Sequence, residues 1–174
     1  KRQLQLSNLK AHLYKQILIS LRLNPQHKNV KLHIRGQLDF ATILYQKGLY
    51  KQSLKILDKA KSFALRYDEN ASAYEIVEFE KLIESLYVTR SLSNRTNELV
   101  SQTNHLKEQN DIYSNLSNIS LQLYEKLIKA GYAKSDNESN DINEFFNHKI
   151  KSFKVEELGF RETLIYYQIW VWYS

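Results

Sequence analysis

Residues that interrupt regular secondary structure are scarce in this chain. Its 174 residues include one proline and four glycines, and these two residue types are the strongest local breakers of helices and strands. Apolar residues recur at spacings of three and four over most of the length, which is the period of an amphipathic helix. With 43% apolar residues, the chain can bury a core of its own. We therefore predict a single all-α domain over residues 1–174, built of about six or seven helices.

The apolar pattern places these helices between the few breakers. The predicted helices cover residues 6–23, 30–47, 50–67, 70–92, 95–130 and 142–153, and a last helix begins near Val155 or Phe160. The polar stretch AKSDNESND (133–141) is predicted to be a solvated loop, with Asp141 capping the helix that follows. The last helix is apolar nearly all round, which indicates burial on more than one side. Because the chain starts without Met and ends inside an apolar stretch, we expect it to be a fragment of a longer protein.

The stretch LYQKGLYKQSLKILDKAKSFA (44–64) has a helix–glycine–helix pattern. Gly48 stands at the turn, where a left-handed backbone favours glycine. Ala41 and Ala60 are small residues, suited to a close approach of the two helices, and Tyr50 and Leu57 supply larger side chains on the second helix. This pattern, clearest over residues 34–67, resembles a tetratricopeptide repeat, which is an antiparallel helix pair.

The resemblance implies a fold and a mode of action. The fold is a short right-handed α-solenoid of stacked antiparallel helical hairpins. Gln37 and Phe40 depart from the repeat, which usually has Trp and Leu there, and the closing proline is absent. The whole chain is also similar to uncharacterised tetratricopeptide-like bacterial proteins of Bacteroidetes. By this similarity the chain is expected to be a non-catalytic scaffold that binds a peptide or partner protein in a groove.

The groove positions implied by the resemblance lie on the first helix of the repeat. They are Arg35, Leu38, Thr42, Tyr45 and Gln46. Leu38 and Tyr45 also fit the apolar stripe of that helix, so a core role competes with a binding role at these two positions. The identity of the partner and the oligomeric state are not indicated by the sequence.

A second hypothesis comes from the charge distribution. Residues 1–38 carry eight cationic side chains and no acidic one, within a chain of net charge +6. Such a segment can neutralise nucleic-acid phosphates, although no recognition motif accompanies it. The residues of this candidate basic patch are Lys10, Lys15, Arg22, Lys28 and Lys31. The competing interpretation is a solvated basic face.

Patterns typical of catalysis are absent from the sequence. There is no cysteine, and the five histidines show neither HExxH nor other metal-ligand spacing. The four glycines are isolated, so no glycine-rich phosphate loop is present. The acidic pairs Glu78 with Glu80 and Glu156 with Glu157 are expected on solvated helix faces. We therefore predict no enzyme activity, no metal and no cofactor.

Two weaker patterns concern association and location. Leucines at 92, 99 and 106 and Tyr113 are spaced seven apart, but the companion heptad positions are polar. A stable coiled coil needs both apolar positions, so the stripe either rests on a neighbouring helix or self-associates; the aromatic last helix is a second candidate for self-association. No apolar run reaches the length of a membrane span, and the lack of cysteine fits a cytoplasmic location.

Overall fold

The computed structural model describes residues 2–23, 29–86, 93–130 and 136–173. Within these ranges the chain forms seven α-helices, one short 3₁₀ helix and no strand, which confirms the all-α prediction. The helices are α1 (Arg2–Leu23), α2 (Val30–Gln46), α3 (Tyr50–Arg66), α4 (Asn70–Leu86), α5 (Ser93–Ala130), α6 (Asp136–Ile150) and α7 (Phe160–Tyr173), with η1 at Val155–Glu157. No helix in the described ranges combines the length and the apolar character needed to cross a bilayer.

The α2–α3 hairpin has the local chemistry that its sequence indicates. Asn29 caps the start of α2, since its side-chain oxygen accepts a hydrogen bond from the backbone N–H of Leu32. At the other end Gly48 has φ +75°, and the N–H of Leu49 donates to the carbonyl of Leu44 at 2.9 Å. Together with the bond from Gly48 N–H to Tyr45 O, this is a Schellman motif. The predicted glycine turn is therefore confirmed.

The α3–α4 turn repeats this motif without a glycine. Asp68 takes the left-handed conformation with φ 54°, and the N–H of Glu69 donates to the carbonyl of Ala64 at 2.9 Å. Aspartate tolerates this conformation better than most residues that bear a Cβ. Successive helices therefore reverse direction by the same backbone geometry at both turns.

Helices α2, α3, α4 and the first part of α5 enclose one apolar core. Ala41 on α2 and Ala60 on α3 are both buried, and the Ser53 hydroxyl donates to the carbonyl of Ala41 at 2.8 Å across the α2–α3 contact. Leu57 is fully buried, and Tyr50 is half-buried against the same core. The core consists of Ile34, Leu38, Ala41, Leu57, Ala60, Ala64, Ala73, Ile76, Val77, Ile83, Leu99 and Leu106.

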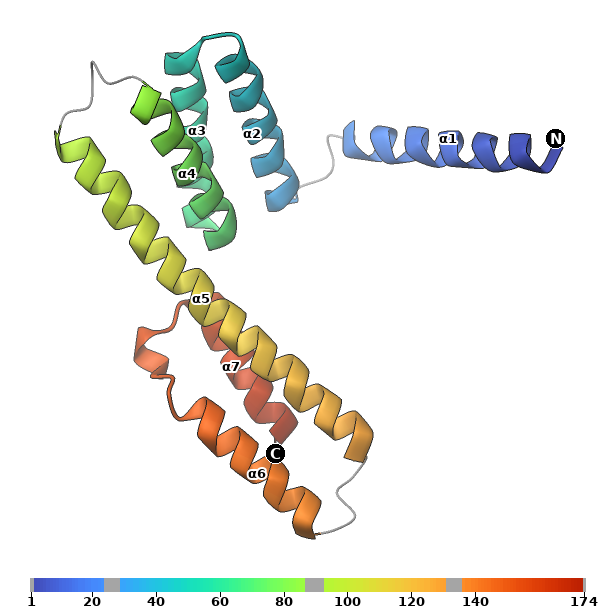
Figure 1. Ribbon diagram of the computed structural model, residues 1–174, viewed down its shortest axis with the longest axis vertical. Helices are drawn as coiled ribbons and strands as arrows, with labels where there is room; N and C mark the ends of the chain where they lie inside the picture. The colour runs from blue at the N-terminus through green and yellow to red at the C-terminus, as the bar shows by residue number, and fades with distance from the viewer. Residues whose placement is uncertain (1, 24–28, 87–92, 131–135, 174) are drawn as a thin grey trace.

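A second core lies along the other half of α5. It consists of Leu116, Ile119, Leu123, Phe146, Ile150 and Ile169, from α5, α6 and α7. Figure 1 shows α5 running past α4 and continuing between the two groups of helices, with α7 returning alongside it. The 38 residues of α5 therefore serve both cores.

Arg161 at the start of α7 connects the C-terminal helices to the α3–α4 turn. Its guanidinium donates to the Glu69 carboxylate at 3.2 Å and to the carbonyl of Asp68, and it lies over the Tyr113 ring. Leu99 and Leu106 of the seven-residue stripe are buried in the first core, while Leu92 falls outside the described ranges. These two leucines therefore rest on neighbouring helices within the chain and are not available for self-association.

Two sequence predictions about residues 133–141 need correction. The polar stretch 133–141 was predicted to be a loop, but α6 already begins at Asp136, so Asp141 lies inside the helix and does not cap it. Asn, Asp and Ser favour helix starts as well as loops, and the stretch has no Gly or Pro to prevent a helix. The predicted end of the fourth helix near residue 92 and the break at Gly131 fall outside the described residues.

The last helix is also less enclosed than its composition indicates. Ile169 is fully buried, but Phe160, Leu164 and Val171 are 72%, 62% and 72% exposed on the opposite side of α7. Neighbouring helices α2 to α5 pack in adjacent pairs. The right-handed solenoid itself stays a prediction.

Candidate functional site

A hollow of about 470 Å³ opens between α2 and α4 at the N-terminal end of the helical stack. It is lined by Arg22, Leu32, Arg35, Leu38, Asp39, Thr42, Glu75 and Phe79. Three of the five groove residues predicted from the sequence, Arg35, Leu38 and Thr42, are therefore brought together here.

One wall of the hollow is a single face of α2. Arg35, Leu38 and Thr42 follow at spacings of three and four, which places them on adjacent turns of the same side. Leu38 is mostly buried and forms the apolar floor of the hollow. The Thr42 hydroxyl donates to the carbonyl of Leu38 at 2.8 Å, so its hydroxyl hydrogen is already used inside the helix.

The opposite wall comes from α4, which the sequence did not connect with the site. Glu75 and Phe79 lie one turn apart there. The Phe79 ring packs edge-on against Tyr45, with 5.5 Å between ring centroids. Tyr45 is half-buried against the core and touches Tyr50 as well. It therefore supports the wall from behind, while Gln46 is exposed at the end of α2 and does not line the hollow.

The hollow carries charges of both signs. Arg22, at the end of α1, forms an ion pair with Asp39, and both side chains remain more than half exposed. Among the ion pairs of the described residues, neither Arg35 nor Glu75 takes part. The hollow thus presents one unpaired cation, one unpaired anion and an apolar floor.

The basic patch is less continuous in space than in sequence. Lys31 pairs with Glu69 at 3.6 Å, and Arg22 pairs with Asp39. Lys10 and Lys15 are exposed on α1 and form no ion pair within the described ranges. Lys28 lies outside those ranges. Two of the four described members are therefore already neutralised by acidic side chains of α2 and of the α3–α4 turn.

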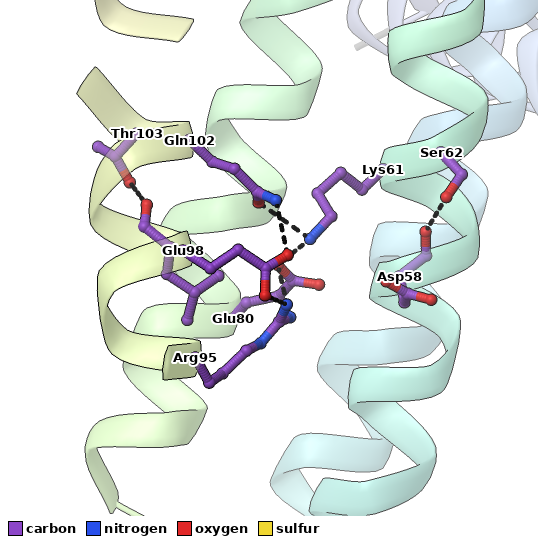
Figure 2. A network of polar contacts seen from close by, with 9 residues as sticks. Asp58, Lys61, Ser62, Glu80, Arg95, Glu98, Gln102 and Thr103 are labelled. Atoms are coloured by element: carbon purple, nitrogen blue, oxygen red, sulfur yellow. Dashed lines mark hydrogen bonds and ion pairs between the residues drawn. The ribbon is translucent and has the colours of Figure 1, made fainter. Parts of the chain in front are cut away.

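A buried polar network occupies the contact of α3, α4 and α5. Figure 2 shows Lys61, Glu80 and Arg95 converging from these three helices. The Lys61 ammonium lies 2.7 Å from Oε2 of Glu80, and Arg95 approaches the same oxygen at 3.5 Å. Lys61 also donates to Gln102, which in turn donates to Glu98. The network ties three consecutive helices together inside the first core.

The prediction that Glu80 lies on a solvated helix face is wrong. Its side chain is fully buried, and its Oε1 atom accepts no hydrogen bond. Burial raises the pKa of Glu80 above its ordinary value, although the hydrogen bond from Lys61 and the charges of Lys61 and Arg95 act in the opposite direction. The sequence held one signal for this pair, because Lys61 interrupts the otherwise apolar face of Leu57, Ala60 and Ala64.

The network has the features of a structural element. It is enclosed by helices, and the α2–α4 hollow does not reach it. In the described part of the chain, no group of three or more His, Cys, Asp or Glu residues is arranged to hold a metal ion. The α2–α4 hollow is therefore the candidate functional site.

Comparisons of the chain with protein-family models, with curated proteins and with solved structures give no match. The function of the chain is consequently inferred from the geometry of the α2–α4 hollow.

Proposed function

We propose that this chain is a tetratricopeptide-like, non-catalytic protein-interaction module that binds a peptide segment of a partner in the α2–α4 hollow. One observation carries the proposal: Arg35, Leu38 and Thr42 line one open hollow, opposite Glu75 and Phe79. A groove between the first helices of neighbouring hairpins is where helical-repeat proteins present a concave binding surface.

The composition of the hollow matches a short peptide. Leu38 and Phe79 offer apolar surface for a side chain of the ligand, and unpaired Arg35 and Glu75 offer polar anchors of opposite sign. Binding sites commonly combine an apolar lining with a few placed polar groups that orient the ligand. We therefore expect a ligand that has an apolar residue flanked by charged ones.

Selection from a display library of random linear peptides tests this proposal directly. Peptides enriched on the wild-type protein are then titrated against it by fluorescence anisotropy. Charge reversal by Arg35→Glu is expected to weaken binding at least tenfold, which corresponds to about 1.4 kcal/mol. The matched control is Lys59→Glu, because Lys59 is an exposed cation on α3 that does not line the hollow.

Equal binding of the enriched peptides to wild type and to Arg35→Glu would contradict the proposal. The alternative function is nucleic-acid binding by the N-terminal segment, which the exposed and unpaired Lys10 and Lys15 favour. In that case no peptide is enriched, and single-stranded or duplex DNA binds with an affinity that falls steeply between ~50 and ~200 mM salt. A double variant, Lys10→Glu with Lys15→Glu, would then abolish DNA binding.

A further inference from the structure

Helix α1 is the one described helix whose side chains stay exposed along its length. Every side chain from Leu6 to Leu23 is exposed, and Figure 1 shows α1 pointing away from the other helices. Five large apolar side chains recur at spacings of three and four and form a stripe along α1. They are Leu6, Leu9, Leu13, Ile17 and Leu21, between 48% and 63% exposed.

An isolated helix with such a stripe is poorly stabilised in water. Helices in proteins gain most of their stability from packing an apolar face rather than from the propensity of their residues. A contiguous exposed apolar surface of this kind usually marks an interaction site. We therefore expect the apolar stripe of α1 to pack against another surface.

Helix α2 has an outer face of matching character. Leu32, Phe40 and Ile43 are 45%, 56% and 53% exposed there, on the side away from the buried residues of the helix. Gly36 lies between Leu32 and Phe40, and a Cβ built on it would meet no atom within 4 Å. An open glycine within an apolar face allows the backbone of another helix to approach closely.

We propose that α1 of one copy packs along the outer face of α2 in a second copy, and reciprocally, so that two chains exchange α1 in a symmetric dimer. Exchange of an identical element is a low-cost route to a dimer, because the contact repeats itself in both directions. Leu32 also lines the α2–α4 hollow, whereas Phe40 and Ile43 do not, so the dimer contact borders the proposed peptide site and is tested separately from it at Phe40.

The position of Arg22 disfavours packing of α1 on its own α2. Arg22 pairs with Asp39, which is nine residues beyond the first residue of α2, or roughly 13 Å along the helix axis. In a tight antiparallel hairpin, Arg22 would instead lie beside the first turn of α2. The observed ion pair therefore places the end of α1 beside the middle of its own α2, and the rest of α1 points outward (Figure 1), where its stripe is presented to another molecule.

The area available for burial fits a second copy. A half-exposed large apolar side chain retains on the order of 80 Å² to bury. If fully buried, five from α1 and three from α2 give up to roughly 640 Å² per contact and up to roughly 1,300 Å² for two contacts, which reaches the lower end of the ~1,200–2,000 Å² of stable interfaces.

The first test measures mass in solution by analytical ultracentrifugation over a wide range of protein concentration. The expected result is a dimer for wild type and a monomer for Leu13→Asp and for Phe40→Asp. The matched control is Leu121→Asp, because Leu121 on α5 is equally apolar and 68% exposed; this variant should remain a dimer. Leu13 and Phe40 belong to neither apolar core, so circular dichroism should show that both variants keep their helical fold.

The second test uses introduced cysteines, since the natural chain has none. Leu13→Cys and Phe40→Cys are made in separate chains, mixed and oxidised. Exchange of α1 predicts a disulfide between the two different chains. When both cysteines are placed in one chain, an internal disulfide that forms in the monomer would instead show that α1 folds back on its own α2, and this would overturn the proposal.

Three further outcomes would also overturn it. One is a wild-type protein that is monomeric at every concentration. Another is a dimer that persists in both Leu13→Asp and Phe40→Asp, because it would use a different surface. The third is a monomer that binds vesicles containing anionic phospholipid and loses this binding on Leu13→Asp, because the stripe of α1 would then face a membrane surface.

Discussion

Lys61 on α3 and Glu80 on α4 form an ion pair in the protein interior, with 2.7 Å between Nζ and Oε2. Both side chains are almost completely buried. Removing one partner of such a pair leaves an uncompensated buried charge, which typically costs about 3–5 kcal/mol. Lys61→Met is therefore expected to lower the free energy of unfolding by about that amount, measured by urea denaturation.

An exposed pair on α4 provides the matched control for this prediction. Lys81 and Glu78 lie 2.8 Å apart with both side chains more than a third exposed, and exposed pairs contribute only about 0–1 kcal/mol. Lys81→Met should therefore have little effect. The double variant Lys61→Met with Glu80→Leu should regain most of the loss, since an apolar replacement of a buried pair is often neutral. A loss for Lys61→Met no larger than for Lys81→Met would refute the buried-charge explanation.

The raised pKa of Glu80 makes a signed prediction about pH. Burial raises this pKa above the ordinary value of 4.5, so the folded state holds the proton more tightly than the unfolded state. The stabilisation linked to Glu80 is therefore complete below pH 4.5 and is lost as the pH rises through the folded-state pKa. Relative to Glu80→Gln, which cannot titrate at this position, wild type should gain stability as the pH is lowered from neutral towards 4.5.

Urea denaturation of both proteins across this pH range measures the difference. Glu78→Gln serves as the reference, because Glu78 lies on the same helix but is partly exposed. The prediction fails if the difference in the free energy of unfolding between wild type and Glu80→Gln does not change with pH. It also fails if wild type becomes more stable relative to Glu80→Gln as the pH rises, because burial would then not raise the pKa of Glu80.

The two helix turns predict opposite effects of adding and removing a Cβ. Gly48 and Asp68 both have a left-handed backbone, which costs a residue bearing a Cβ roughly 1–2 kcal/mol. Gly48→Ala should destabilise the protein by about that amount, whereas Asp68→Gly should stabilise it by up to about 1 kcal/mol. Gly36→Ala is the control, because Gly36 lies within helix α2 and has open space around it in the single chain; all variants are compared at a protein concentration at which the protein is monomeric.

Thermal unfolding followed by circular dichroism separates these three variants. Gly36→Ala is expected to be neutral or stabilising by about 0.4–1 kcal/mol, since alanine reduces the freedom of the unfolded chain at a compatible site. Equal shifts in the same direction for Gly48→Ala and Gly36→Ala would rule out the role of the left-handed turn.

The close contact of α2 and α3 predicts a penalty for a larger side chain at Ala60. Ala60 is 2% exposed, and added methylene groups in a packed core typically cost about 1–3 kcal/mol. Ala60→Leu should lower the free energy of unfolding by that amount in urea denaturation. Ala71→Leu makes the same change at an exposed position of α4 and should cost much less. If the two variants are equally stable, the helices do not meet closely at Ala60.

Features that depend on neighbouring residues in the chain were predictable from the sequence. The period of apolar residues located the helices from α2 to α5, and Gly48 located the first turn, because helix capping and left-handed turns are decided within a few residues. The same local spacing put Arg35, Leu38 and Thr42 on one face of α2. For this reason three of the eight residues that line the candidate site were identified from one helix alone.

The opposite wall of the site depends on which helices meet. Glu75 and Phe79 join the hollow only because α4 packs beside α2, and Glu80 is buried only because α3 and α5 close over it. In the sequence Glu80 looks like any acid on a helix surface. Its burial is decided by contacts with Lys61 and Arg95, which lie 19 and 15 positions away.

The sequence by itself determined that the chain is helical, where most of its helices begin and end, and which residues share a helix face. Only the tertiary structure decided that α5 serves two cores, that Lys61 and Glu80 pair inside the first of them, and that the stripe of α1 stays exposed. The physical reason is that helix formation is governed by short-range hydrogen bonds and side-chain spacing. The pairing of helices is governed by the burial of surface between residues far apart in the chain.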